Sequence, residues 1–309
     1  MINFSSSSPD SNISTMKRNT IVMNHLGSLD ARRIGRKNLI LAFAVIAAAA
    51  ILPAEDKPDV SGTSAKPEAA PEPAADPAGR DVSVSLSTAL QSAYVWRGIT
   101  VNDEPVIQPS VEVVIDGLTI NVWVNGDMTT QTDRGIKAGQ VSETDLTMYY
   151  TKAFGPDELY QLSFGCIDYL FPSAGTTTEF FVSFGMDTIA SPAITIYRDV
   201  DLPALYASLG ASHKHTVNES IEIEASAAIG LGDSNWGKLM FGLSDDDASF
   251  GLYDVSVVVS ATYALTAEMS ISVTATVSSV INSDAADALD AADIKTTTAV
   301  IGLAWSMSL

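Results

Sequence analysis

The chain has 309 residues, with 37 Asp and Glu against 17 Lys and Arg, and its formal net charge is -20 at pH 7. This acidic balance excludes nucleic acid as a partner, because phosphate backbones require a basic surface. It also disfavours binding to anionic lipid headgroups through a polybasic patch. The abundance of Ser, Thr, Val and Ala, together with few lysines, favours strands over helices.

The N-terminal segment predicts export. A basic cluster at residues 32–37 precedes the apolar run 39–52, and Pro53 and a polar segment follow. The apolar run is shorter than the roughly 20 residues that a helix needs to cross a bilayer, so a permanent anchor is disfavoured. We therefore predict a cleaved signal sequence with an extended N-terminus over residues 1–54, with cleavage after Ala50 or Ala54.

Residues 55–80 consist mainly of Pro, Ala, Glu and Asp, with almost no large apolar side chain. Such a segment cannot bury enough apolar surface to offset the entropy lost on ordering. We predict a disordered linker at the periplasmic side, which ends where the patterned part of the chain begins.

Residues 81–309 alternate apolar and polar side chains in segments of about ten residues, which is the length and period of strands that cross an outer membrane. The alternation is unbroken over 265–277 and clear over 221–229 and 253–263. Twelve strands are predicted, over residues 82–98, 105–115, 117–127, 142–154, 158–171, 176–187, 191–199, 204–214, 219–231, 250–263, 265–280 and 295–309.

The connections between these strands alternate between short turns and longer polar loops. Short turns are expected at Asp116-Gly117, at 155–157, at 187–191, at 215–218 and near Ala264. Short turns on one side and long loops on the other are typical of outer-membrane barrels. The segment 236–241 is assigned to a long loop, 232–249, because a thirteenth strand would place the two chain ends on opposite sides.

The fold class that follows is all-β, a closed antiparallel transmembrane β-barrel over residues 81–309. A soluble two-sheet sandwich would use the same strands. Its outward face should be charged, whereas here one face is aliphatic and the other carries Ser, Thr, Gly and Glu. The aliphatic face therefore favours contact with lipid.

The last strand supports the same compartment. In residues 296–309, Ile301, Leu303, Trp305, Met307 and Leu309 share one face. A strand that finishes on an apolar residue resembles the C-terminal signal of bacterial outer-membrane barrels. We therefore expect an outer-membrane location in a two-membrane bacterium, with lipids and the barrel-assembly machinery as partners.

A series of short motifs occurs along the patterned region, namely Tyr94–Thr100, Pro105, Gln108-Pro109, Glu143–Leu146, Asp168-Tyr169, Pro172, Glu179, Ser191-Pro192 and Tyr197–Asp199. These motifs resemble those of the TorF family of outer-membrane porins, over most of residues 82–309 and most clearly up to about Gly210. The resemblance implies an outer-membrane barrel, whereas a pore is implied only by the name of the family. Arg198 beside Asp199 and the acidic segments 245–247 and 283–293 depart from the family pattern.

If the aliphatic face meets lipid, the opposite face lines the interior, and acids dominate there. Acidic linings concentrate and favour cations, so the sequence predicts passive, weakly cation-favouring passage of small solutes. The alternative is that these acids pair with Arg97 and Lys214 inside a plugged lumen, in a structural or adhesive surface barrel. The lumen candidates are Arg97, Gln108, Glu112, Asp145, Glu179, Glu222, Glu224, Asp254 and Glu268.

Two acidic loops are candidates for a special role. Consecutive aspartates at 245–247 lack the spaced ligands and the glycine turn of a calcium loop, so solvated charge is expected there. The aspartates of 284–293 recur every third residue among alanines, which predicts a short exposed helix, with a cap or lid over the outer mouth as the alternative.

No constellation for catalysis stands out. His213 and His215 have no Gly-x-Ser-x-Gly elbow and no spaced metal ligands beside them. Cys166 is the single cysteine, so no disulfide can form within the chain. We expect no enzyme activity, no cofactor and no metal, with an outer-membrane barrel hydrolase as the remaining enzymatic alternative.

Overall fold

The computed structural model describes residues 82–132, 135–172 and 174–309. The predicted signal sequence (1–54) and the predicted linker (55–80) lie outside the described residues. In the described parts of the chain, none of the helices has the length and apolar character needed to span a bilayer.

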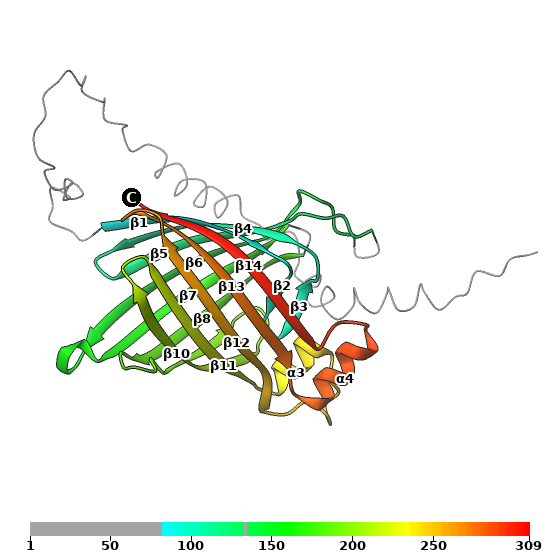
Figure 1. Cartoon of the computed structure of the whole chain (residues 1–309). Coiled ribbons are helices and arrows are strands. Elements are labelled where there is room, and N and C mark those ends of the chain that lie inside the picture. The colour runs from blue at the N-terminus through cyan, green and yellow to red at the C-terminus, as the bar shows by residue number, and fades with distance from the viewer. Residues whose placement is uncertain (1–81, 133–134, 173) are drawn as a thin grey trace, which may run out of the picture.

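Twelve strands close into a single antiparallel barrel, in which β1 pairs with both β4 and β14 (Figure 1). The predicted fold class is confirmed, and the sandwich alternative is wrong, because closure leaves no open sheet edge. The wall strands are β1 (Val82–Gln91), β4 (Val106–Ile115), β5 (Leu118–Asp127), β6 (Val141–Phe154), β7 (Tyr160–Phe171), β8 (Gly175–Met186), β9 (Ala193–Asp199), β10 (Leu205–Asn218), β11 (Ile221–Gly232), β12 (Gly251–Ala264), β13 (Met269–Val280) and β14 (Thr297–Ser308).

Among the described residues, five further elements lie outside the wall. They are β2 (Tyr94–Trp96), β3 (Ile99–Asn102), the 3-10 helix η2 (Pro156–Glu158), α3 (Ser234–Phe241) and α4 (Ser283–Ala291). The predicted first strand, 82–98, was therefore too long. The chain reverses at Arg97 and Gly98, whose φ angles are 47° and 83°, and two consecutive positive φ values suit a tight hairpin turn. Strands β2 and β3 form a two-stranded sheet of their own.

The connections sort to the two ends of the barrel as the sequence predicted. The short ones, such as Asp116-Gly117 between β4 and β5, share one end with Leu309, whose backbone N–H bonds to Val84. We call this the turn end. Helices α3 and α4 lie at the opposite end, which we call the loop end (Figure 1).

Both loop helices begin at residues that cap them. Asp233 accepts a hydrogen bond from the backbone N–H of Trp236 at 2.7 Å, and Asn282 accepts one from Ala285 at 3.0 Å. Such caps satisfy backbone donors that a helix leaves free. The short helix predicted in 284–293 is present as α4, but it is not the exposed helix that was expected, because Ala285 and Leu289 are 0% exposed in the core of the loop end. The segment 236–241 lies in a loop as predicted, where it forms most of α3.

The outer surface of the barrel is an apolar band. Register keeps its members side by side, as in the pairs Val182↔Ile196 and Val257↔Val277. Soluble proteins rarely expose a continuous apolar surface of this extent. Exposed members include Leu90, Ile107, Met148, Leu162, Phe164, Phe180, Val182, Ile196, Val259, Val273, Ile301 and Leu303. Hydrocarbon is the medium that such a surface requires.

Cys166 provides a test of this band. It lies opposite Met148 on β6 and Phe180 on β8, so its thiol belongs to the outward face. In liposomes we expect a lipid-soluble maleimide to label Cys166 and a sulfonated, membrane-impermeant maleimide to leave it unlabelled. As the control, Ser244→Cys in a Cys166→Ser background should react with both reagents, because Ser244 is exposed in a loop. Labelling of the folded wild type by the sulfonated reagent would contradict the lipid-facing assignment.

Candidate functional site

The loop end of the barrel is filled by a packed core. Three segments meet there, namely the β2–β3 hairpin with its flanks (92–105), the α3 loop (233–250) and the α4 loop (281–296), and we call them together the plug. Trp236 on α3 is 1% exposed, and its ring centroid lies 4.6 Å from that of Tyr206. The buried core of the loop end comprises Ile99, Ala204, Tyr206, Trp236, Phe241, Tyr253, Val280, Ala285, Leu289, Ala292 and Ile294.

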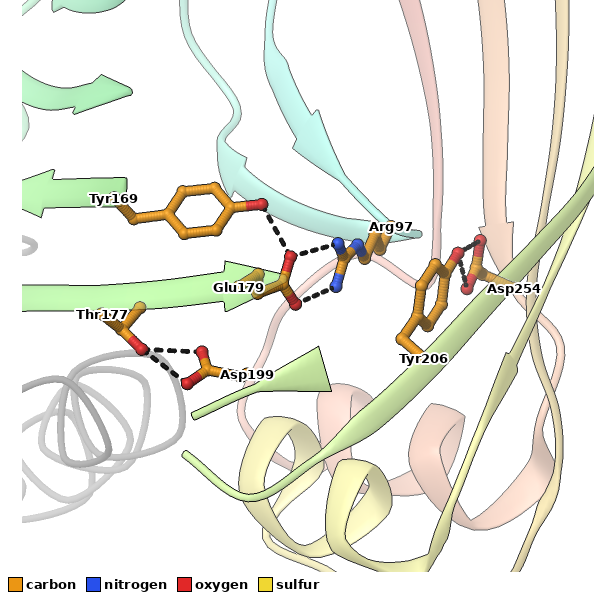
Figure 2. A network of polar contacts seen from close by, with 7 residues as sticks. All are labelled: Arg97, Tyr169, Thr177, Glu179, Asp199, Tyr206 and Asp254. Atoms are coloured by element: carbon orange, nitrogen blue, oxygen red, sulfur yellow. Dashed lines mark hydrogen bonds and ion pairs between the residues drawn. The ribbon is translucent and has the colours of Figure 1, made fainter. Parts of the chain in front are cut away.

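Arg97 ties the tip of the hairpin to the wall. Its Nη1 and Nη2 atoms donate to the two carboxylate oxygens of Glu179 on β8, at 2.8 and 2.6 Å (Figure 2). A two-point arginine–carboxylate pair is both strong and directional. The next residue, Gly98, lies so close to the wall that an added Cβ would be 2.7 Å from the Cβ of Asp254. The hairpin therefore reaches far enough inward to touch β12.

Aromatic rings surround the same guanidinium group. Its central carbon lies 4.3 Å from the ring centroid of Tyr206, 4.4 Å from that of Tyr197 and 4.5 Å from that of Trp96. Trp236 contributes a fourth ring at 5.3 Å. Cations are attracted to the faces of aromatic rings at these distances. Arg97 is thus held by one carboxylate and by rings from the hairpin, β9, β10 and α3.

Hydroxyl groups extend this network along the wall. Tyr169 donates to Glu179 at 2.9 Å, so Glu179 lies between Arg97 and Tyr169 (Figure 2). Tyr206 donates to Asp254 at 3.1 Å. A neighbouring pair, Thr177 and Asp199, is joined at 2.7 Å. The contacts connect inner faces of β7, β8, β10 and β12 through the tip of the hairpin.

Register places most of the candidate residues from the sequence on the inner face. The hydrogen bonds of Gln108 to Asn125 and of Asn121 to Ser110 fix which face of β4 and β5 points inward. The same alternation continues around the barrel through the paired strands. The inner-face candidates are Gln108, Glu112, Asp145, Glu179, Glu222, Glu224 and Asp254.

Two candidates lie elsewhere than the sequence indicated. Arg97 is in the β2–β3 turn rather than on a wall strand, although its side chain still points into the lumen. Glu268 is in the turn before β13, which begins at Met269 rather than at residue 265. The hydroxyl of Thr266 accepts the backbone N–H groups of Glu268 and Met269, and this local turn starts the strand later. Glu268 therefore does not belong to the inner face.

The inner charges fall into two groups with different solvent access. Near the plug, Glu143 and Glu179 are buried. Toward the turn end, Lys214 lies 3.4 Å from Glu222 and 3.7 Å from Glu224, and these side chains are 60%, 42% and 34% exposed. Lys214 lies beyond Gly210, the last residue of β10 that pairs with β9, so these side chains are open to water at the turn end. We call this wet turn-end part of the inner face the vestibule.

Several residues in or against the plug were missed as site residues. Tyr197 and Tyr206 lie opposite each other on the inner face, between outward neighbours such as Ile196 and Ala207. The sequence did contain a signal for them, because both tyrosines alternate in phase with the inner face of their strands. Trp236 could not be placed, because its position depends on how the α3 loop folds into the barrel.

The loop acids and the histidines make local contacts. Lys238 donates a hydrogen bond to Asp245 at 2.6 Å, and this bond holds the pKa of the Asp245 carboxyl below its usual value. His213 Nδ1 lies 2.7 Å from the carbonyl oxygen of Ile189. Among the described residues, no group of three or more His, Cys, Asp or Glu side chains is arranged to hold a metal ion.

A sequence-family model, described as "Bacterial protein of unknown function (Gcw_chp)", matches residues 74–249. The chain belongs to the Gcw_chp family. The matched region includes the β2–β3 hairpin, Glu179 and α3, so most of the plug lies inside the family's defining segment. No curated protein matches this Gcw_chp chain.

Solved structures similar to the Gcw_chp barrel include outer-membrane proteins. The NanC porin gives a TM-score of 0.45 at 8% identity, over 73% of this chain and 100% of the porin. An outer membrane channel from Pseudomonas putida F1 gives 0.44 at 11% identity, over 74% and 95%. The KdgM porin, solved with disordered oligogalacturonate, gives 0.43 at 10% identity, over 74% and 99%.

Proposed function

We propose that this Gcw_chp barrel lies in the outer membrane of a two-membrane bacterium and passes small solutes passively, with a weak preference for cations. The observation that carries the proposal is the sign of the inner charges. Acids outnumber bases on the described inner surface, and acidic linings concentrate cations. The acids include Glu112, Asp127, Glu143, Asp145, Glu179, Asp199, Glu222, Glu224 and Asp254, against Arg97 and Lys214.

The membrane location is supported by the apolar band and by closure of the barrel. In hydrocarbon every backbone N–H and C=O group needs an internal partner, and closed barrels and helices are the structures that provide one. The resemblance to the TorF family and the apolar final strand agree with export by a cleaved signal sequence and insertion by the barrel-assembly machinery. Lipids would then cover the outward face.

The route through the barrel would have two parts. The vestibule admits water and ions from the turn end, and the plug narrows the loop end. Solutes would then pass the loop end through an opening beside the β2–β3 hairpin or after the hairpin moves. The packed core around Trp236 and Phe241 favours a second candidate, a structural or adhesive surface barrel with a closed lumen. We propose no catalytic role, and the contact of His213 with a backbone carbonyl offers no nucleophile for the hydrolase alternative.

Charge neutralisation in the vestibule tests the cation preference. In planar bilayers under a KCl gradient, the double variant Glu222→Gln/Glu224→Gln should lower the cation-to-anion permeability ratio a few-fold toward one. Both carboxylates are exposed to the permeating water, so their field acts on passing ions. Removing them leaves Lys214 without its partners, which adds to the change.

The matched control is Glu268→Gln, which removes the same charge from a turn outside the inner face. Its reversal potential should equal that of the wild type. An unchanged reversal potential in the double variant would remove these two residues from the permeation path. A folded barrel that never conducts would favour the closed structural candidate.

A further inference from the structure

A cavity of about 110 Å³ lies inside the plug. It is bounded by the β2–β3 hairpin, by α3 and by the inner faces of wall strands from β6 to β9. An apolar cavity of roughly 150 Å³ in another protein takes up benzene. The cavity in the plug therefore suits a compact molecule of roughly five or six heavy atoms.

The cavity walls combine aromatic rings with carboxylates. Tyr94, Trp96, Tyr169 and Trp236 provide rings, while Glu143 and Asp199 provide negative charge. Aromatic faces attract cations more strongly when water is excluded, as it is around the buried side chains of Tyr94, Tyr169 and Trp236. Arg97 already lies over Trp96 and Trp236, so an occupant with a positive charge would use the remaining ring faces and would need the carboxylates to offset the charge of Arg97.

The charges around the cavity do not balance within the described chain. Arg97 pairs with Glu179, but Glu143 and Asp199 have no Lys or Arg within ion-pair distance among the described residues. One carboxylate oxygen of Asp145, the next inner-face residue after Glu143 on β6, is buried with no hydrogen-bond partner. Buried carboxylates without counter-charge are costly, so an occupant with a positive charge would be stabilised.

A second polar group lacks a partner at the same place. Trp236 lines the cavity at 1% exposure, and its indole Nε1–H is buried without an acceptor. An occupant that carries a hydroxyl beside its charge could accept this hydrogen bond. A bare metal ion fits poorly, because hard cations prefer six or more oxygen ligands and these walls are mainly apolar.

We propose that this cavity is a binding site for a small organic ammonium ion of at most six heavy atoms, such as dimethylethanolammonium (protonated 2-dimethylaminoethanol). The proposal rests on the proposed passage function, because it names the class of cationic solute that the plug would select. The remaining ring faces would contact the ammonium group, and Glu143 would supply a carboxylate that has no Lys or Arg partner among the described residues.

Binding of dimethylethanolammonium chloride to the purified, detergent-folded barrel tests the proposal directly, by calorimetry and by tryptophan fluorescence. We expect saturable binding that is about tenfold tighter than that of its neutral carbon isostere, 3-methyl-1-butanol. Glu143→Gln should weaken binding of the ammonium ion about tenfold. The control Glu222→Gln, which removes the same charge from the vestibule, should leave it unchanged.

A second variant covers the case in which Glu143→Gln does not fold. Leu239→Trp fills the cavity from the half-buried side of α3 and keeps every carboxylate, so it should abolish binding. The proposal is overturned by absence of saturable dimethylethanolammonium binding, by equal binding of the neutral isostere, or by full binding in a folded Glu143→Gln or Leu239→Trp protein.

Conductance separates this site from the passage function. Dimethylethanolammonium binding by a barrel that stays silent in bilayers would support the site and remove the passage function. Cation-selective conductance without binding of this ion would keep the passage function and overturn the site.

Discussion

Replacing Arg97 with methionine is expected to raise the single-channel conductance of the barrel and to lower its thermal stability. The change leaves the buried carboxylate of Glu179 without its counter-charge and removes the cation from four aromatic rings. Removing one partner of a buried ion pair costs about 3–5 kcal/mol. The hairpin tip would then leave the wall, which widens the loop end. Planar-bilayer recording and thermal melting measure the two effects.

Lys214→Met is the matched control, because it also removes one positive charge from the lumen. Its ion pairs with Glu222 and Glu224 are exposed, so its loss should change the free energy of unfolding by about 1 kcal/mol or less. Equal conductance in the two variants would show that charge alone, and not release of the hairpin, sets the current. Adding Glu179→Gln to Arg97→Met should restore part of the lost stability, because the orphaned charge disappears.

The sequence was sufficient for the barrel wall, because the wall follows from local pattern. Strict alternation fixes which side chains share a face, and one buried or lipid-covered face then fixes the register. Turn chemistry marked several strand ends. Asp116 and Gly117 adopt φ angles of 50° and 85°, as a two-residue hairpin between twisted strands requires. Helix α4 was predictable from its alanines, and Asn282 caps it.

The plug was not predictable in the same way, because its contacts join distant parts of the chain. Arg97 and Glu179 are 82 residues apart, and no local pattern links them. The apolar residues around Arg97 resembled the continuation of β1, and only the Arg97-Gly98 step signalled a reversal. The alternation in the sequence was sufficient to place most of these acids on the inner face. It could not show which acids are buried by the plug and which are exposed in the vestibule, because that depends on where the loops fold.

Replacing Trp236 with alanine should detach the α3 loop and leave the wall intact. Trp236 packs on Tyr206 and on Trp96, at ring-centroid distances of 4.6 and 5.6 Å, and so connects α3 to the wall and to the hairpin. Truncating a buried tryptophan to alanine costs about 3–5 kcal/mol. The wall keeps its strand pairing, because none of its ladders includes α3.

Two measurements in detergent distinguish detachment of the α3 loop from unfolding of the wall. Limited proteolysis reports the loop, and heat-dependent gel mobility reports the folded barrel. The Trp236→Ala protein should be cleaved within 233–250 while its gel mobility stays that of a folded barrel. Phe250→Ala is the control, because Phe250 lies in the same loop with 69% of its surface exposed and should resist cleavage as the wild type does. Resistance in Trp236→Ala would mean that the hairpin and α4 hold the loop end without α3. Cleavage together with loss of the folded mobility would mean that plug and wall form one cooperative unit, in which case the plug could not open while the barrel stays folded.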